Sequence, residues 1–478
     1  MEDKNIKFEL KQVSENEVRG IVNKLKSKKS SGHDGLSSEV LKLCGEEIIP
    51  PLTSIINKSI ESRTFPEEWK YSKVVPLHKK GDRKSLPNYR PVSLLPVAGM
   101  VLEKCVSTQI YEYFEENDLF GHFQFGFRKG KSCISELLTL MDHLLEAKEM
   151  KKEIALILYD LSAAFDTISH DILIEKFKLY GFQEGAIQWI TSYLKNRRQS
   201  VVIDGKVSAS VDIKVGTPQG SRISPLLFIC LMADLDLYTD QSLLSNFADD
   251  TQSVIIADTE EQVKEIAKKE ANSVIDFFRS NDLVNNATKA ALLMNSKGKS
   301  LEASISDIGG TILKSKSSEK LLGLHVSSSL DWKDHVEKLS VELRKRIGLL
   351  RRIKNKVTHD KLRIIAEALF NSKCRYGIAV YLTPVYDEED LKMEMLPPET
   401  EKLQTLQNSM LRTIYGLPPS QHTNMKKLRL SLKMMSINQM SVYHTLIETY
   451  NVIRNSSSEH LKEKLLPKAD NKGYGLRG

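Results

Sequence analysis

Cysteine is scarce in this chain, since its 478 residues include only five, and these are scattered. No two have the spacing of a metal-binding pair, and an odd, sparse set does not make a disulfide framework. We therefore expect an intracellular protein, located in the nucleus, the cytoplasm or both. No stretch comes near the roughly 18 consecutive apolar residues of a membrane-spanning helix. The charged amino-terminal segment also lacks the apolar core of a secretory signal.

The composition is that of a folded protein with a mild excess of base. Lysine and arginine number 69 against 62 aspartates and glutamates, which gives a net charge of +7. This balance permits a nucleic acid as partner but does not require one. At roughly 150 residues per domain, the length predicts about three domains or subdomains.

Three aspartates lie where strands are expected to end or turn. Asp160 closes the apolar run 153–160, and Asp249 and Asp250 lie at the centre of a predicted hairpin, 243–257. If these strands are neighbours, the carboxylates converge and need a cation between them. Oxygen ligands suit Mg²⁺, and two such ions about 3.5–4 Å apart can activate a hydroxyl and stabilise a leaving pyrophosphate. Taken alone, an Asp-Asp pair is more typical of an ordinary turn.

Two further segments bear on this chemistry. The run Gly216–Ser221 (GTPQGS) precedes a predicted helix. Its glycines permit close backbone approach to a ligand, and Gln219 can both donate and accept hydrogen bonds. Phe165 follows Asp160 closely and could press on the sugar of a bound nucleotide. The alternatives are a helix-capping loop and a core phenylalanine.

A basic loop lies between two predicted short strands within 73–95. Its cationic side chains could grip triphosphate oxygens, Arg90 in a bidentate manner. The alternative is a solvated surface run. These residues are Lys79, Lys80, Arg83 and Arg90.

Taken together and in order, eight segments resemble the reverse transcriptases of non-LTR (LINE-type) retrotransposons. The resemblance covers about residues 15–380. Single motifs of this kind are weak evidence, whereas eight in the family's order are highly specific. The segments are KSSGHDGLSSEVLK, FPEEWKYSKVVPLHKKGD, NYRPVSLLPVAGMVLEK, FQFGFRKGKSC, YDLSAAFDTISHDIL, GTPQGSRISPLLF, FADDTQ and LLGLHVSSSLDWKDHVEKL.

The resemblance implies a metal site made of three aspartates. Asp160 matches the first metal-binding aspartate, Asp249 the second, and Asp250 the third and more tolerant acidic position. The backbone carbonyl of Leu161 would also face a metal. The implied cofactor is a pair of Mg²⁺ ions, for which Mn²⁺ could substitute.

The resemblance also implies roles for residues around an incoming nucleotide. Phe165 matches the gate that excludes a ribose 2′-hydroxyl, and Arg90 matches an arginine on the triphosphate, with Lys79 or Lys80 as helper. Gln219 and Gly220 match a loop that contacts nucleotide and template. Lys289 matches a lysine proposed to protonate the leaving pyrophosphate, as a general acid could. A surface lysine without this role remains an open alternative.

Residues 338–363 combine an apolar stripe with a strongly basic face. Such a helix suits a polymerase thumb that follows a template–primer backbone through sequence-independent, salt-sensitive contacts. The alternative is an ordinary solvated helix face. The nucleic-acid-binding residues expected here are Arg344, Lys345, Arg346, Arg351 and Arg352.

The expected fold is α+β, a right-hand polymerase with fingers, an antiparallel palm sheet and a helical thumb. The boundaries would be 1–145 for an amino-terminal extension and fingers, 146–300 for the palm, 301–384 for the palm end and thumb, and 385–478 for a carboxy-terminal helical region. Template RNA, primer DNA and dNTPs are the implied partners, with an endonuclease either separate or missing.

Two rival functions are also compatible with the sequence. One is a catalytically decayed or repurposed polymerase fold that only binds RNA. The other is an RNA-templated RNA polymerase, against which the bulky Phe165 argues.

Overall fold

The computed structural model describes residues 6–287, 289–382, 397–418 and 420–466. The chain divides into two compact units. The first unit comprises Met1–Phe127, Tyr159–Asp240 and Glu270–Lys289, and the second comprises Arg128–Leu158, Gln241–Lys269 and Ala290–Gly478. Within the described residues, no helix is both long enough and apolar enough to cross a bilayer.

The first unit mixes helices with one small sheet. Its helices, including single 3-10 turns marked η, are α1 (Glu15–Lys24), α2 (Ser38–Leu43), η1 (Gly45–Ile48), α3 (Ile49–Glu61), η2 (Glu67–Trp69), η3 (Leu86–Asn88), α4 (Val97–Glu116), α6 (His170–Leu179), α7 (Glu184–Leu194), α8 (Ser224–Leu231), η4 (Leu235–Tyr238) and the second half of α9 (Glu260–Ser280). Its strands are β1 (Tyr71–His78), β2 (Tyr89–Leu94), β4 (Arg197–Ile203), β5 (Lys206–Val207) and β6 (Val211–Ile213).

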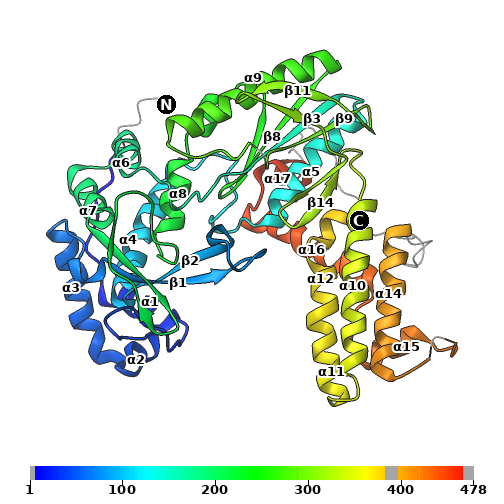
Figure 1. Ribbon diagram of the computed structural model, residues 1–478, viewed down its shortest axis with the longest axis horizontal. Helices are drawn as coiled ribbons and strands as arrows, with labels where there is room; N and C mark the ends of the chain where they lie inside the picture. Colours follow the sequence, from blue (N-terminus) through cyan, green and yellow to red (C-terminus); the bar gives the residue numbers. More distant parts are fainter. Residues whose placement is uncertain (1–5, 288, 383–396, 419, 467–478) are drawn as a thin grey trace, which may run out of the picture. The chain divides into compact units, whose positions relative to one another are not determined.

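The sheet of the first unit has the order β2-β1-β4-β5, and β6 also pairs with β4. Strands β1 and β2 are antiparallel, visible as the paired blue arrows in Figure 1. Strand β4 is parallel to β1 and is extended by a hairpin whose turn is Asp204-Gly205. Fully buried aromatic side chains on several helices form the core of this unit, among them Phe114, Phe177, Trp189, Tyr193 and Phe228.

The second unit contains the longer sheet and most of the carboxy-terminal helices. Its strands are β3 (Glu153–Tyr159), β7 (Leu243–Phe247), β8 (Asp250–Ala257), β9 (Ala291–Ser296), β10 (Lys299–Ser300), β11 (Ser304–Ile308), β12 (Thr311–Lys314), β13 (Ser318–Leu321) and β14 (Leu324–Ser327). Its helices are α5 (Cys133–Glu149), the first half of α9, α10 (Lys333–Ile353), α11 (His359–Ala366), the π-helical turn η5 (Glu367–Asn371), α12 (Ser372–Arg375), α13 (Ile378–Tyr381), α14 (Pro398–Tyr415), α15 (Met425–Ser431), α16 (Ile437–Asn455) and α17 (Glu459–Leu465).

Five strands of the second unit form a sheet in the order β10-β9-β3-β8-β7. Every residue of β3 is buried, as expected for a central strand. One apolar cluster joins this sheet to α5, α10, α14 and α16. Helices α10 and α14 pack against each other, as Figure 1 shows.

The α+β class predicted from the sequence is confirmed. Ser14 with Glu17 predicts a capping box from the sequence, and helix α1 begins there. The sequence pattern also predicts helix over roughly 37–62, but this stretch is broken into α2, η1 and α3. The break lies at Gly45, whose φ of 58° belongs to the left-handed region, which interrupts a right-handed helix. Most of the loop expected at 385–400 lies outside the described residues.

Candidate active site

Asp160 follows the last residue of β3 and is tied to the segment just before Lys289 by main-chain hydrogen bonds. The amide of Asn286 donates to the carbonyl of Asp160 at 2.8 Å, and the amide of Ser162 donates to the carbonyl of Val284 at 2.8 Å. This pairing brings Nζ of Lys289 to 2.8 Å from Oδ2 of Asp160. The two predicted site residues therefore lie together in the first unit as an ion pair.

Asp249 and Asp250 lie at the predicted hairpin turn, in the second unit. Phe247 pairs with Asp250 across the hairpin, so that the turn itself consists of Ala248 and Asp249. Ala248 has a φ of 60° and is 4% exposed. A positive φ at this position matches a tight two-residue hairpin, which needs it. The turn geometry thus places Asp249 at the tip and Asp250 at the start of β8.

The sheet order also relates the strands that carry these aspartates. Strands β3 and β8 are neighbours in the sheet of the second unit. Asp160 directly follows the first of these strands, and Asp250 begins the second. The condition set in the sequence analysis, that the aspartate-bearing strands are neighbours, is therefore met.

Gly216 and Gly220 hold the glycine loop against two other segments of the first unit. A Cβ on Gly216 would lie 2.5 Å from the carbonyl oxygen of Asp166, and one on Gly220 would lie 2.8 Å from that of Ser93. Both contacts are closer than real side chains allow. Both glycines also have positive φ, 80° and 128°. Only glycine meets these two demands at once.

Main-chain hydrogen bonds fasten the same loop on both sides. The amide of Thr217 donates to the carbonyl of Phe165 at 2.9 Å. The amide of Ser93, in β2, donates to the carbonyl of Gln219 at 2.8 Å. The loop therefore bridges the segment after β3 and the strand that carries Arg90.

The side chains of Gln219 and Phe165 are held as well. Nε2 of Gln219 donates to both carboxylate oxygens of Asp166, at 3.0 and 2.9 Å. The half-buried ring of Phe165 lies 5.1 Å from that of Phe228 and 6.4 Å from that of Phe127, measured between centroids. Aromatic contacts of this kind favour one orientation of a ring. The neighbouring rings therefore hold the side chain of Phe165 in place.

A buried glutamate, which the sequence analysis did not single out, anchors the far end of the glycine loop. Oε2 of Glu103, on α4, accepts hydrogen bonds from Oγ of Ser221 at 2.9 Å and from the amide of Arg222 at 2.7 Å. Burial raises the pKa of the Glu103 carboxyl, and the charge of Arg197 opposes that rise. The sequence feature that could have pointed to Glu103 is an acidic residue in the mostly apolar first half of α4.

The basic loop between β1 and β2 presents its predicted residues to solvent. Arg90 lies on β2 opposite Leu77, and Lys79 and Lys80 follow β1. All three side chains are exposed. The amide of Lys79 donates to the carbonyl of Asn88 at 2.8 Å, which closes the base of the loop.

Near the aspartate hairpin, Glu136 of α5 is a second buried acid that sequence reasoning missed. Its Oε1 accepts a hydrogen bond from Oγ of Ser245, on β7, at 2.9 Å. Burial raises its pKa well above the ordinary value, and the negative charge of Asp250 adds to the rise. Burial therefore favours the neutral form of the Glu136 carboxyl.

The predicted basic helix divides into α10, which ends at Ile353, and α11. Its apolar stripe is buried as expected, with Leu343 and Leu350 fully enclosed. Four of the five predicted nucleic-acid-binding side chains are exposed. The fifth, Arg346, is half-buried and donates to the carbonyl of Leu369 and to Glu342, each at 2.6 Å. The four exposed residues are Arg344, Lys345, Arg351 and Arg352.

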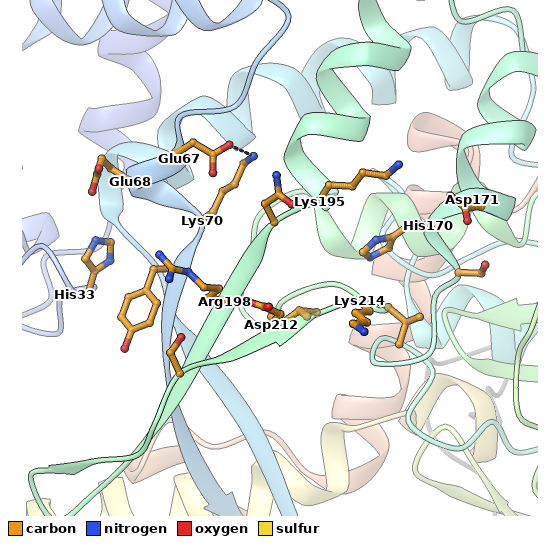
Figure 2. Close-up of a pocket in the computed structure, with 16 residues that line it drawn as sticks. His33, Glu67, Glu68, Lys70, His170, Asp171, Lys195, Arg198, Asp212 and Lys214 are labelled. Atoms are coloured by element: carbon orange, nitrogen blue, oxygen red, sulfur yellow. Dashed lines mark hydrogen bonds and ion pairs between the residues drawn. The ribbon is translucent and has the colours of Figure 1, made fainter.

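A polar cavity of about 920 Å³ also lies in the first unit and contains none of the predicted site residues. It reaches the glycine loop, since Nε2 of His170 lies 2.8 Å from the carbonyl oxygen of Gly216. Figure 2 shows both cationic and anionic side chains around it, with Glu67 and Lys70 ion-paired. Its charged lining residues are Glu67, Glu68, Lys70, Asp171, Lys195, Arg198, Asp212 and Lys214.

Each unit offers oxygen donors, the kind of ligand that Mg²⁺ prefers. In the first unit these are the carboxylate of Asp160 and the main-chain carbonyl of Leu161, and in the second unit they are the carboxylates of Asp249 and Asp250. Asp160 has a cationic partner within its own unit, the ammonium of Lys289. The chemistry of these donors fits a hard divalent cation.

Comparisons with known proteins agree on one family. Residues 77–341, more than half of the chain, match the family described as "Reverse transcriptase (RNA-dependent DNA polymerase)". The chain is 25% identical to the "RNA-directed DNA polymerase from mobile element jockey" of Drosophila melanogaster, a match that covers 96% of this chain and 50% of the relative. It is 31% identical to the "Probable RNA-directed DNA polymerase from transposon X-element" of the same fly, over 49% of this chain and 26% of the relative.

Among solved structures, apo telomerase from Candida tropicalis is similar with a TM-score of 0.40 and 13% identity, over 60% of each chain. The chain spans about half the length of the jockey relatives it matches. The matched family and the named elements confirm the resemblance to non-LTR enzymes noted in the sequence. This chain therefore belongs to the reverse transcriptase family, and its relatives are proteins of non-LTR retrotransposons.

Proposed function

We propose that this chain is the RNA-directed DNA polymerase of a non-LTR retrotransposon and extends a DNA primer on an RNA template. One observation carries the proposal. Main-chain hydrogen bonds bind the glycine loop to both Phe165 and strand β2, next to the segment that holds Asp160 against Lys289. A rigid arrangement of this kind orients a nucleotide for reaction.

In this proposal Asp160, Asp249, Asp250 and the carbonyl of Leu161 hold two Mg²⁺ ions, for which Mn²⁺ could substitute. When bound, the ions would lower the pKa of the primer 3′-hydroxyl and neutralise charge on the phosphates. The adjacency of β3 and β8 supports this assignment.

The remaining roles fall to residues of the first unit. The exposed Arg90, with Lys79 or Lys80, binds the triphosphate. Phe165 excludes a 2′-hydroxyl, and its fixed ring supports that role. Gln219 and Gly220 line the nucleotide and template side, where the close approach of Gly220 to β2 leaves no room for a side chain.

The proposed reaction is a nucleotidyl transfer. The primer 3′-oxygen attacks the α-phosphorus of a dNTP, a new P–O bond forms, and the bond to pyrophosphate breaks. Lys289 donates a proton to the departing oxygen as charge develops on it, as a general acid does. Its position beside Asp160 supports this role.

The proposal also covers whole regions of the chain. For the fingers, palm, thumb and carboxy-terminal region it keeps the boundaries predicted from the sequence. The exposed basic face of α10 would contact the template–primer duplex. The protein would act inside the cell, in the nucleus, the cytoplasm or both. An endonuclease, either a separate protein or another domain of a longer one, would supply the primer end.

The test is primer extension by purified protein on a poly(rA)/oligo(dT) duplex with Mg²⁺. We expect extension with dTTP and not with UTP, and loss of extension in Asp249→Ala. Asp276→Ala, which removes an exposed aspartate paired with its helix neighbour Arg279, is the matched control and should extend normally. Salt-sensitive duplex binding without extension by the wild type would favour the RNA-binding scaffold.

A further inference from the structure

Two histidines and a glutamate cluster in the second unit, away from the aspartate hairpin. His143 and Glu146 lie on α5, and His460 lies on α17. One ligand atom from each of the three side chains lies within 4.8 Å of the ligand atoms of the other two. The spacing i, i+3 places His143 and Glu146 on one face of α5. The third donor, His460, comes from the separate helix α17.

The donor types in this cluster differ from those of the aspartate site. Two imidazoles and a carboxylate suit Zn²⁺ and related divalent transition metals, whereas Mg²⁺ prefers oxygen alone. The rings of His143 and His460 lie 3.8 Å apart between centroids. One ion could therefore contact a nitrogen of each ring.

A second observation points to a metal ion. Nε2 of His460 lies 2.6 Å from Oδ2 of Asp142. Histidine ligands of metals usually donate their other ring N–H to a carboxylate, which fixes the tautomer and orients the ring. Asp142 is placed to do this for His460, because a proton on Nε2 leaves the lone pair on Nδ1.

Glu146 supplies the carboxylate of the cluster, one turn of α5 after His143. One oxygen of Glu146 lies 2.8 Å from Nζ of Lys464, and a carboxylate has a second oxygen to offer.

We propose that His143, Glu146 and His460 bind one Zn²⁺ ion that clamps the carboxy-terminal helix α17 onto α5. The two helices already meet through a hydrogen bond of 2.7 Å between Oγ1 of Thr139 and Oγ of Ser458. The ion would add a stronger bridge at the next turn of α5. With three protein ligands, water completes the coordination.

The experiment uses the full chain, stripped with EDTA and titrated with Zn²⁺ in excess Mg²⁺ against a chromophoric chelator. We expect one site in the wild type and its loss in His143→Asn and His460→Asn. Asp142→Asn, which removes only the orienting carboxylate, should weaken binding by about 10- to 100-fold. His422→Asn is the matched control, since that imidazole is exposed and outside the cluster.

Two further readouts distinguish this cluster from the aspartate hairpin and from nonspecific zinc binding. Asp249→Asn should keep full Zn²⁺ affinity, which excludes binding at the aspartate hairpin. Zn²⁺ should raise the melting temperature of the wild type but not of His460→Asn, and the two metal-free proteins should melt cooperatively. No Zn²⁺ binding by the wild type, or equal binding by wild type and both histidine variants, would overturn the proposal.

Discussion

In the proposed reaction, the side chain of Phe165 acts as a steric filter for the sugar of the nucleotide. Its ring cannot turn aside freely, because the rings of Phe228 and Phe127 lie against it. The variant Phe165→Ala would open space for a 2′-hydroxyl. We therefore expect the preference for dTTP over UTP to fall by about 10- to 100-fold, which is the discrimination that a small steric difference usually gives.

The measurement is the ratio of kcat/KM for dTTP and UTP in primer extension. Phe127→Ala is the comparison variant, because the ring of Phe127 lies farther from that of Phe165 than the ring of Phe228 does. It should lower both rates by similar factors. An unchanged ratio in Phe165→Ala would remove Phe165 from the sugar filter.

Lys289 is the second residue whose role a substitution can resolve. Loss of a general acid typically lowers a rate by about 10²- to 10⁴-fold, so Lys289→Met should lower kcat by about 10²-fold while KM for dTTP changes little. Lys297→Met, which replaces an exposed lysine in the turn before β10, should leave kcat unchanged.

If Lys289 serves only as the ionic partner of Asp160, the outcome differs. The Mg²⁺ concentration that the variant needs would then change, while kcat at saturating Mg²⁺ would stay close to that of the wild type.

At the scale of elements, helix α10 carries two kinds of basic residue. Some are exposed to solvent, whereas Arg346 forms hydrogen bonds that hold the helix in place. Arg344 and Lys345 are exposed, whereas Arg346 bonds to Leu369 and Glu342. The double variant Arg344→Ala/Lys345→Ala should bind the template–primer duplex more weakly. The slope of log K against log salt should fall by about 0.9 for each lost phosphate contact.

Arg346→Ala gives the contrasting result. It should lower the free energy of unfolding by about 0.5–1.5 kcal/mol, because two partly buried hydrogen-bond acceptors lose their donor. The salt slope should stay at the wild-type value. Fluorescence anisotropy over a salt series measures the slope, and chemical denaturation measures the stability.

Elements with a strong local signal could be predicted from the sequence. The capping box at Ser14 and the hairpin around Asp249 form as predicted. Two alternating runs around Asp204-Gly205, within 199–215, predict a further hairpin, which also forms. Their signals reside in a few adjacent residues, where hydrogen bonding and φ preferences decide the structure. The short strands over 304–327 were not predicted, because brief, mostly polar runs carry little periodicity.

Some residues of the candidate site could likewise be predicted from the sequence, and others could not. The aspartates, the glycine loop and Lys289 could be located from motifs. Glu103 and Glu136 could not, because their burial depends on segments more than a hundred residues distant, at Ser221 and Ser245. Sequence spacing alone does not show which segments will enclose an acid.

At the scale of the whole molecule, buried acids make stability depend on pH. Burial raises the pKa of Glu136 well above its ordinary value of 4.5. The unfolded chain therefore releases this proton at lower pH than the folded chain, and stability is lost as pH rises from about 4.5 through the folded pKa. The variant Glu136→Gln, which keeps the acceptor and cannot ionise, should escape this loss.

We expect the variant to match the wild type near pH 4 and to exceed it at alkaline pH by about 1–3 kcal/mol, the cost of a poorly satisfied buried group. Urea denaturation at a series of pH values measures the difference. A constant difference across the series would show that Glu136 does not titrate on unfolding.

The link between Asp160 and the stretch before Lys289 consists of main-chain atoms. It should therefore tolerate many amino-acid substitutions. Amide and carbonyl groups are the same in nearly every residue, so substitutions at Val284, Asn285 or Asn286 leave the pairing intact. A replicating lineage can therefore accumulate neutral changes there without displacing the lysine. Proline at position 286 is the exception, because it has no N–H to give to Asp160.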